Sequence, residues 1–410
     1  MGNNVHIAGT GVISAIGMNL AENLSSLAAG RTGIGAIRRL PTVHQADFPS
    51  GEVGLSNVEL QEKCGWHSYP KNSISRTAML GYLAAKEAVN AAGLNLSNMG
   101  EERVRCGFIS ATSVGGMDST EDFFPAFMQN PATGGSLRRV RQHECGAVTN
   151  HIAKALNPGN WTYTSTISTA CSSAANAIML GARMIKAGML DVVLAGGTDA
   201  LSRFTLNGFN TLMILDHEPC QPFDRQRRGL NLGEGAGYLL LVSDTVKERY
   251  GLSAKVRLTG YANANDAHHQ TASSPDGAGS FLAMKDALAI SGLQPADIQY
   301  INLHGTGTQN NDASESTAIR RLFTEGLPRL STTKGFTGHT LAACGGIEAA
   351  YSVASLERQC LYPGLRITQP VIEEPGVMVS RFEEGVTLKN ILSNSFGFGG
   401  NCSSLIFSVS

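Results

Sequence analysis

The chain has 410 residues, of which 42% are hydrophobic and 16% are charged, a composition typical of a globular protein large enough for two fused lobes. Its formal net charge of −1 argues against a nucleic-acid-binding protein, which needs a basic surface. No apolar run reaches the roughly 18–20 residues of a membrane span, and the N-terminus lacks the pattern of a signal peptide. Eight scattered cysteines without a C-x-x-C pair predict reduced thiols, a cytoplasmic location and no zinc site.

Apolar and glycine patterns predict alternating strands and helices along the first half of the chain. The expected strands are 5–13, 104–111, 163–169, 191–195 and 237–242, and the expected helices are 18–29, 75–92, 150–156 and 174–186. Segments 37–70 and 117–149 lack clear periodicity and are expected to be irregular. The second of these segments is expected to cover a pocket or to form a subunit interface.

The second half repeats the first. Residues 84–94 read AAKEAVNAAGL and residues 283–293 read AMKDALAISGL, and each copy lies between a glycine-turn strand and an apolar strand. Self-similarity in a fixed order predicts an internal duplication of a β/α lobe. We therefore expect an α/β layered fold whose halves, 1–250 and 251–410, share one core.

Cys171 stands among small residues where the strand expected at 163–169 meets the helix expected at 174–186. The first turn of a helix carries unpaired N–H groups and the positive end of the helix dipole. We therefore expect a lowered pKa for this thiol and a role as a nucleophile. A structural reading competes with this hypothesis, because free cysteines are usually packing residues.

Three further segments could build a site with Cys171. His304 begins the polar turn HGTGT, Lys334 and His339 lie five residues apart in KGFTGH, and residues 394–400 form a glycine-rich loop. Each has a structural explanation when taken alone. Together they predict an activated thiol, two histidines and an oxyanion-binding loop, which fits an acyl transfer in which an enolate must also be stabilised.

These motifs resemble those of the elongating β-ketoacyl-acyl-carrier-protein synthases of the thiolase superfamily. The matching segments are TACSSA around Cys171, PFD at Pro222 with GEGAG at Gly233, HGTGT at His304, KGFTGHT at Lys334 and NSFGFGG at Asn394. The resemblance implies a five-layer αβαβα fold of two related halves. It also implies a ping-pong condensation, in which Cys171 accepts an acyl group from acyl carrier protein and malonyl-acyl carrier protein then loses CO2 and extends it.

The same resemblance implies roles for individual residues. His304 and His339 would promote decarboxylation and stabilise the enolate, and the N–H groups of Cys171 and Phe398 would form the oxyanion hole, with Phe398 also gating the acyl pocket. The remaining residues of the expected site are Lys334 and Glu348 in support, and Thr306, Thr308, Val114 and Phe396 in substrate binding. Substrates arrive on phosphopantetheine, so no cofactor or metal is expected. The expected assembly is a homodimer, or a heterodimer with a related subunit.

The sequence departs from the family pattern in two of these motifs, and basic residues near Lys71 and Arg76 are fewer than is usual in the family. Arg228 replaces the second Asp of PFD-x-x-RDG, and Asn401-Cys402 stands where Thr-Asn is usual. The condensing residues are intact, so these departures concern the substrate. They favour a branch that makes specialised polyketides or aryl polyenes over core fatty-acid synthesis.

Three alternatives remain open. A non-condensing chain-length factor would lack the cysteine that this chain has. A thiolase acting on coenzyme A esters would use one histidine and a second cysteine near the C-terminus, where Cys402 lies. The sequence does not exclude a synthase that is active only with a partner subunit.

Overall fold

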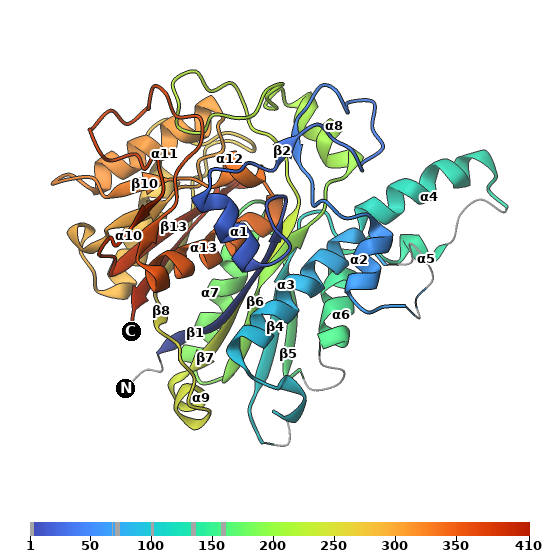
Figure 1. Cartoon of the computed structure of the whole chain (residues 1–410), viewed down its shortest axis with the longest axis horizontal. Coiled ribbons are helices and arrows are strands. Elements are labelled where there is room, and N and C mark those ends of the chain that lie inside the picture. The colour runs from blue at the N-terminus through green and yellow to red at the C-terminus, as the bar shows by residue number, and fades with distance from the viewer. Residues whose placement is uncertain (1–3, 68, 70–73, 100–101, 133–136, 157–160) are drawn as a thin grey trace.

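A computed structural model describes residues 4–67, 69, 74–99, 102–132, 137–156 and 161–410 (Figure 1). Ten strands form one mixed sheet in the order β10-β9-β13-β14-β8-β1-β7-β6-β4-β5. These strands are β1 (Val5–Ser14), β4 (Cys106–Ala111), β5 (Tyr163–Ile167), β6 (Val192–Asp199), β7 (Gly235–Ser243), β8 (Val256–Asn265), β9 (Tyr300–Asn302), β10 (Arg329–Ser331), β13 (Asn390–Gly397) and β14 (Asn401–Val409). Two small pairs accompany them: β2 (Ile34–Gly35) with β3 (Ser50–Gly51), and β11 (Cys360–Leu361) with β12 (Glu383–Glu384).

The two halves of the sheet have the same topology. From the centre outward the first half runs β1-β7-β6-β4-β5 and the second runs β8-β14-β13-β9-β10. In each half the first two pairings are antiparallel and the next two are parallel. The predicted duplication is therefore confirmed by strand order and direction, whereas the division of the chain at residue 250 stays a prediction.

The helices form three layers around the two halves of the sheet. They are α1 (Leu20–Ala28), α2 (Asn57–Lys63), α3 (Arg76–Ala92), α4 (Met117–Gln129), α5 (Leu137–Val140), α6 (Cys145–Leu156), α7 (Ser173–Lys186), α8 (Arg203–Thr211), α9 (Asp244–Arg249), α10 (Ala278–Ser291), α11 (Gln309–Leu322), α12 (Lys334–Thr337) and α13 (Cys344–Arg358). Helices α7 and α13 lie in the centre, with α3 and α6 outside one half and α10 and α11 outside the other (Figure 1). This is the expected five-layer αβαβα arrangement.

Strand β6 shows why the layers hold together. Val193 and Ala195 belong to the apolar core around the central helices, while Val192 and Leu194 belong to the core beneath α3. A strand buried on both faces has apolar side chains at successive positions. The hydrophobic effect therefore stabilises both adjoining layers through this one strand.

Glycines let the central helix α13 lie directly on β7. A Cβ on Gly237 would lie 2.3 Å from the Ile347 nitrogen, and a Cβ on Gly346 would lie 2.3 Å from the Gly237 oxygen. Real Cβ atoms do not approach backbone atoms so closely, so both positions require glycine. This contact fixes the distance between α13 and the sheet, and the first turn of α13 borders the site described below.

Several expected boundaries were wrong. Segment 117–149 is largely helical rather than irregular: it contains α4 and α5, and α6 begins at Cys145 instead of 150. No side chain caps α4, and Pro125 lies inside it, so the usual helix signals are missing. Segment 37–70 contains β3 and α2, and α2 has a capping box between Ser56 and Glu59 that the sequence displayed.

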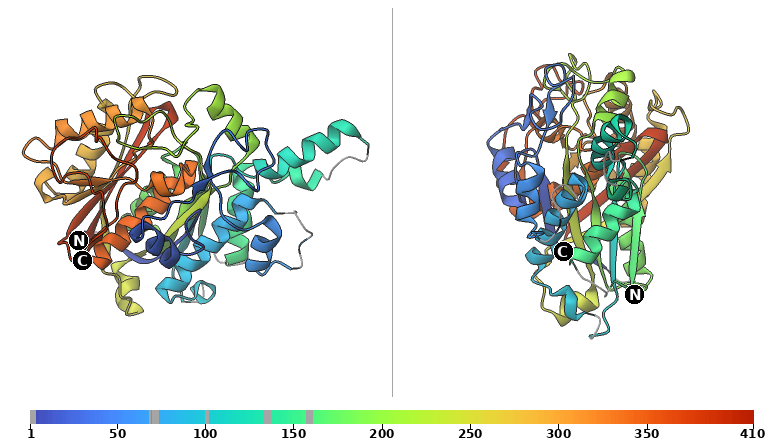
Figure 2. Two further views of the ribbon diagram at one scale, coloured as in Figure 1. Left: turned by 45° about the horizontal axis from the view of Figure 1, so that its top comes forward. Right: turned by 90° about the vertical axis from the view of Figure 1, so that its right-hand side faces the viewer.

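The chain also has a projecting arm, formed by α4 and α5, that extends from the globular body (Figure 2). Its exposed apolar side chains are Phe124, Phe127, Met128, Leu137 and Val140. Among the described helices, none combines the length and the apolar character needed to cross a membrane.

Candidate active site

The residues predicted to carry the chemistry converge on one cavity of ≈ 240 Å³. Its lining includes Cys171, His304, His339, Thr306, Thr308, Phe396 and Phe398. These side chains come from both halves of the chain. The cavity therefore forms where the turn before α7 and the segment before α13 meet the loops after β9 and β13.

Cys171 lies on a tight turn between β5 and α7. The preceding residue, Ala170, has φ of 52°, in the left-handed region that is unfavourable for a side chain with a Cβ. The turn is held by hydrogen bonds from the Ser173 N–H and hydroxyl to the Ala170 carbonyl. This local strain presents Cys171 to the cavity while leaving its side chain buried.

The expectation of a lowered thiol pKa was wrong. Burial raises the pKa of Cys171 to about 11, and the nearby carboxylate of Asp199 adds to the increase. The charge of Lys334 and hydrogen bonds from the backbone N–H groups of Phe398 and Cys171 act in the opposite direction but are weaker. Desolvation of the thiolate therefore outweighs the favourable electrostatics at the start of α7.

His339 is held in one tautomer by the backbone. Its Nδ1 accepts a hydrogen bond of 3.1 Å from the Leu341 N–H, so the ring proton lies on Nε2. Burial and the charge of Lys334 place the pKa of His339 well below its usual value. The ring is therefore neutral at neutral pH and offers its Nε2–H as a donor.

His304 reaches the same state through Lys334. The Lys334 Nζ lies 3.3 Å from His304 Nδ1 and donates to the His304 carbonyl at 2.5 Å. An ammonium group can only donate, so Nδ1 accepts and the ring proton lies on Nε2. Burial, Lys334 and His339 place the pKa of His304 well below its usual value. The two rings meet edge to face, with centroids 5.4 Å apart.

Glu348 and Lys334 form a buried ion pair behind His304. Burial alone would lower the pKa of Lys334, but the attraction of Glu348 outweighs burial and the pKa is raised above its usual value. The ammonium group therefore stays charged. Neither residue is among those that line the cavity, and the supporting role expected for them stays a prediction. Glu348 is on α13, so this pair ties the central helix to the loop that carries His304.

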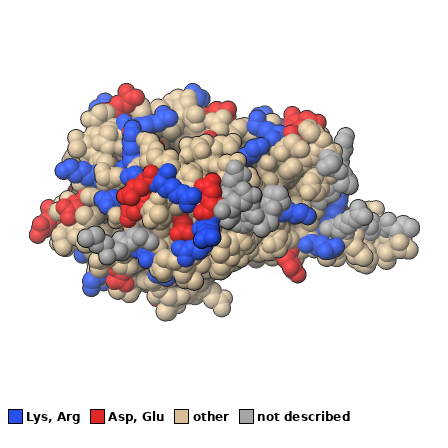
Figure 3. Space-filling view, turned by 90° about the horizontal axis from the view of Figure 1, so that it is seen from below, with Lys and Arg blue, Asp and Glu red and all other residues tan. Residues whose placement is uncertain are grey.

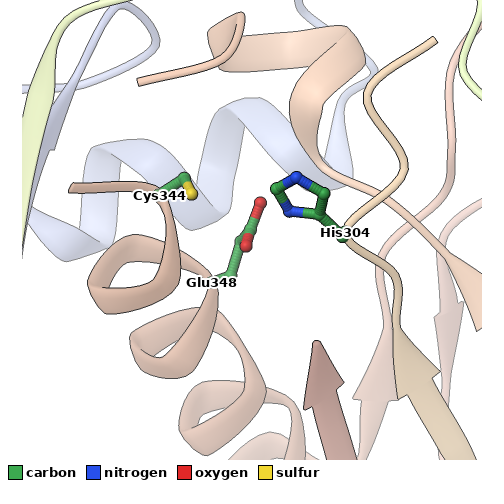
Figure 4. Close-up of side chains that lie close together, drawn as sticks. All are labelled: His304, Cys344 and Glu348. Atoms are coloured by element: carbon green, nitrogen blue, oxygen red, sulfur yellow. The ribbon is translucent and has the colours of Figure 1, made fainter. Parts of the chain in front are cut away.

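His304, Cys344 and Glu348 also place donor atoms within 4.8 Å of one another (Figure 4). Such a set of nitrogen, sulfur and oxygen could suit zinc. However, the ammonium of Lys334 already pairs with Glu348 and contacts His304, and the Cys344 thiol donates to the Cys171 carbonyl at 3.1 Å. This donor set is therefore engaged with a protein cation, and we assign no metal to it.

Two buried carboxylates were missed by sequence reasoning. Glu315 on α11 accepts the backbone N–H groups of His304 and Gly305, both at 2.9 Å. Asp199 at the end of β6 accepts the N–H groups of Val114 at 3.2 Å and Ala342 at 2.8 Å. Both shape the loops of the site from outside the motifs that the sequence displays, so no local motif marked them.

The expected substrate-binding residues divide into two groups. Thr306 and Thr308 line the cavity with hydroxyl oxygens 3.0 Å apart, and Phe396 and Phe398 also line it. Phe398 also stacks on Phe209 of α8 with ring centroids 5.7 Å apart. Val114 is not among the lining residues of this cavity, but it is buried in an apolar cluster that includes Leu230, which does line the cavity.

Near the PFD motif, the structure shows the contacts of Arg228, which departs from the family pattern, and of its neighbour Arg227. Arg228 is exposed and pairs with Asp216 at 3.0 Å, so its charge stays in contact with solvent. Arg227 is buried and donates to the carbonyl groups of Thr308 and Gln309. Arg227 therefore holds the junction between HGTGT and the start of α11.

Comparison with known proteins identifies the family. The descriptions "Beta-ketoacyl synthase, N-terminal domain" and "Beta-ketoacyl synthase, C-terminal domain" match residues 2–246 and 256–368. A 3-oxoacyl-[acyl-carrier-protein] synthase 2 from Staphylococcus aureus (strain N315) is 30% identical over 98% of this chain and 97% of its own length. A synthase of the same name from Synechocystis is also 30% identical over 98% of this chain and 97% of its own length.

Solved structures agree with this result. The ishigamide ketosynthase/chain length factor superposes with a TM-score of 0.90 at 27% identity, over the full length of both chains. A ketosynthase in complex with its chain length factor from Xenorhabdus doucetiae gives a TM-score of 0.81 at 30% identity, covering 100% of this chain and 98% of the other. The chain therefore belongs to the β-ketoacyl synthase family of acyltransferases.

Proposed function

We propose that this chain transfers an acyl group from an acyl carrier protein to Cys171 and condenses it with malonyl-acyl carrier protein. The products are CO2 and a 3-oxoacyl-acyl carrier protein that is two carbons longer. The observation that carries this proposal is the meeting, in one cavity, of Cys171 with two neutral histidines that each hold a proton on Nε2. The backbone N–H groups of Cys171 and Phe398 would serve the acyl-transfer oxyanion, which leaves the two histidine donors for the oxygen of an enolate.

In the first step, the Cys171 sulfur attacks the carbonyl carbon of the carrier thioester. The new C–S bond forms, the carbonyl oxygen becomes an oxyanion, and the N–H groups of Cys171 and Phe398 stabilise it. The bond to the pantetheine sulfur then breaks. The proton lost by Cys171 leaves with the pantetheine thiol, so no stable thiolate is needed despite a pKa of about 11.

In the second step, the bond between the malonyl carboxylate and its neighbouring carbon breaks. CO2 leaves, and the electron pair forms an enolate. The enolate oxygen accepts hydrogen bonds from the Nε2–H groups of His304 and His339. The enolate carbon attacks the acyl-Cys171 carbonyl, a C–C bond forms, and the C–S bond breaks. Cys171 recovers its thiol by taking up one proton from the solvent, which balances the departure of CO2.

The cavity walls suit a substrate carried on phosphopantetheine. Thr306 and Thr308 offer hydroxyl groups to the polar arm, while Phe209, Phe396 and Phe398 offer apolar surface to the acyl chain. This chemistry needs no bound cofactor, because the carrier supplies the pantetheine. The similarity to ketosynthases that act with chain length factors favours a specialised polyketide or polyene product over core fatty-acid synthesis.

We also propose that the chain forms a dimer with a second copy of itself. Strand β5 lies at the edge of the sheet with its residues partly exposed, and an unpaired edge can pair with another strand. The projecting arm adds exposed apolar surface: Phe124 is 59% exposed, Met128 63% and Leu137 73%.

The face in Figure 3 mixes charges of both signs and offers no single basic surface for nucleic acid.

A panel of acyl-acyl carrier proteins with straight and aryl acyl groups tests the first half-reaction. We expect intact mass spectrometry to detect one acyl adduct per chain in the wild type and none in Cys171→Ala. A thiolase would instead be acylated by coenzyme A esters in preference to carrier thioesters. The absence of an adduct with every primer would contradict the proposed acyl transfer by this chain alone.

A further inference from the structure

The loop that carries Phe398 is the tip of a hairpin. Strands β13 and β14 pair through Gly397 and Asn401, and residues Phe398–Gly400 form the turn between them. The backbone N–H of Phe398 lowers the pKa of the Cys171 thiol, although burial raises that pKa more, so this N–H faces the sulfur. The position of the whole tip relative to α7 therefore sets how far the Phe398 N–H lies from the Cys171 N–H.

Asn401, at the base of this tip, is bound to the nucleophile helix. Its side-chain oxygen accepts three hydrogen bonds: from the Ser172 hydroxyl at 2.6 Å, the Asn176 amide at 2.8 Å and the Asn263 amide at 2.7 Å. Ser172 follows Cys171 directly, Asn176 is on the first turn of α7, and Asn263 is on β8. The Asn401 oxygen thus joins β14 to the start of α7 and to β8, and one of its partners, Ser172, is adjacent to the nucleophile in the chain.

Two further contacts close this network, which we call the Asn401 clamp (Thr169, Ser172, Asn176, Asn263, Asn401 and Ser403). Asn176 donates to the Thr169 hydroxyl at 2.9 Å and accepts from the Ser403 hydroxyl at 2.9 Å. The backbone of the tip is also pressed against the same turn. A Cβ on Gly397 would lie 2.8 Å from the Thr169 oxygen and 3.1 Å from the Cys171 nitrogen.

We propose that Asn401 is a positioning residue that fixes the two N–H groups of the oxyanion hole relative to each other; this inference rests on the proposed function. An oxyanion hole stabilises the transition state only if both donors are held in place before the charge develops. Gly397 brings the tip close to the nucleophile turn, and the clamp prevents it from sliding. The position of Asn401 is also one at which the sequence departs from the pattern of the family it resembles.

The surroundings of Asn401 separate positioning from stability. Asn401 and Asn176 are only partly buried and Asn263 is exposed, so water can replace the hydrogen bonds that a substitution removes. Removing the Asn401 side chain should therefore change the melting temperature little. The histidines lie outside the clamp, so enolate formation should also change little.

The test compares two partial reactions in Asn401→Ala. Acyl transfer from an acyl-acyl carrier protein to Cys171 is timed by intact mass spectrometry, and CO2 release from malonyl-acyl carrier protein is measured separately. We expect acyl transfer to be slower by about tenfold, less than the loss of a whole oxyanion donor. CO2 release and the melting temperature should stay close to those of the wild type. Ser172→Ala, which removes one hydrogen bond to Asn401, should slow acyl transfer in the same sense.

Thr259→Val is the matched control. Thr259 also joins β8 to β14, through a hydrogen bond of 2.7 Å to the Ser408 hydroxyl, but four residues further along β8 from Asn263. It should leave both reactions unchanged. Wild-type acyl transfer in Asn401→Ala, or an equal fall of both reactions with a lowered melting temperature, would overturn the positioning role. A wild-type chain that accepts no acyl group would instead overturn the proposed function.

Discussion

At the residue scale, Cys171 is a nucleophile that keeps its proton. Burial raises the pKa of its thiol to about 11, so alkylation by iodoacetamide in the free enzyme should be slow at neutral pH. The rate should rise about tenfold for each pH unit and show no plateau below about pH 10. Cys171→Ala supplies the background from the other thiols. A plateau near neutral pH would show that the free enzyme holds a thiolate.

Glu315 links the site to the pH dependence of folding. Burial raises its pKa from 4.5 to about 7, so the folded chain holds a proton here that the unfolded chain loses. The stability that this proton gives is complete below about pH 4.5 and is lost as the pH rises through about 7. Relative to Glu315→Gln, the free energy of unfolding of the wild type should fall by up to about 3 kcal/mol as the pH rises across this range. Chemical denaturation of both proteins at several pH values measures this; a constant difference would contradict it.

At the element scale, the packing of α13 on β7 fixes the geometry of the site. Gly237→Ala would push its Cβ into the backbone of Ile347, so we expect a loss of about 1–3 kcal/mol in the free energy of unfolding. The displaced helix should also lower acyl transfer. Gly208→Ala is the matched control, because a Cβ there meets nothing within 4 Å on the exposed face of α8. It should stabilise the protein by about 0.5–1 kcal/mol. Equal effects of the two substitutions would contradict this account.

The elements also show which features of the fold and the site could be predicted from the sequence. The membership of Cys171, His304 and His339 in one site could be predicted from sequence, because each lies in a short contiguous motif. That of Asn401 and Glu315 could not, because their partners are 229 and 11 residues away and only the fold brings them together. Strand β6 was expected to stop at Gly196, yet it continues to Asp199, since Gly196 is required by the close approach of the Gly237 oxygen rather than by a turn.

At the scale of the whole molecule, the projecting arm of α4 and α5 predicts self-association. Sedimentation should show a dimer for the wild type and a folded monomer for the double variant Phe124→Ser, Met128→Ser, because both side chains are exposed within one chain. Phe204→Ser, which removes an exposed phenylalanine on α8 outside the arm, should remain dimeric. A wild-type monomer at micromolar concentration would contradict the proposed homodimer, and dimerisation only after addition of a related subunit would establish the heterodimer instead.

The central claim is that one chain couples decarboxylation to carbon–carbon bond formation on Cys171. The most direct measurement is a single turnover of the acylated enzyme with malonyl-acyl carrier protein labelled with ¹³C in its free carboxyl group. We predict one labelled CO2 released for each 3-oxoacyl-acyl carrier protein formed, with the product two carbons longer than the primer and the acyl group lost from Cys171. Labelled CO2 released without elongated product, or an acyl-Cys171 that persists while malonyl is consumed, would contradict the account.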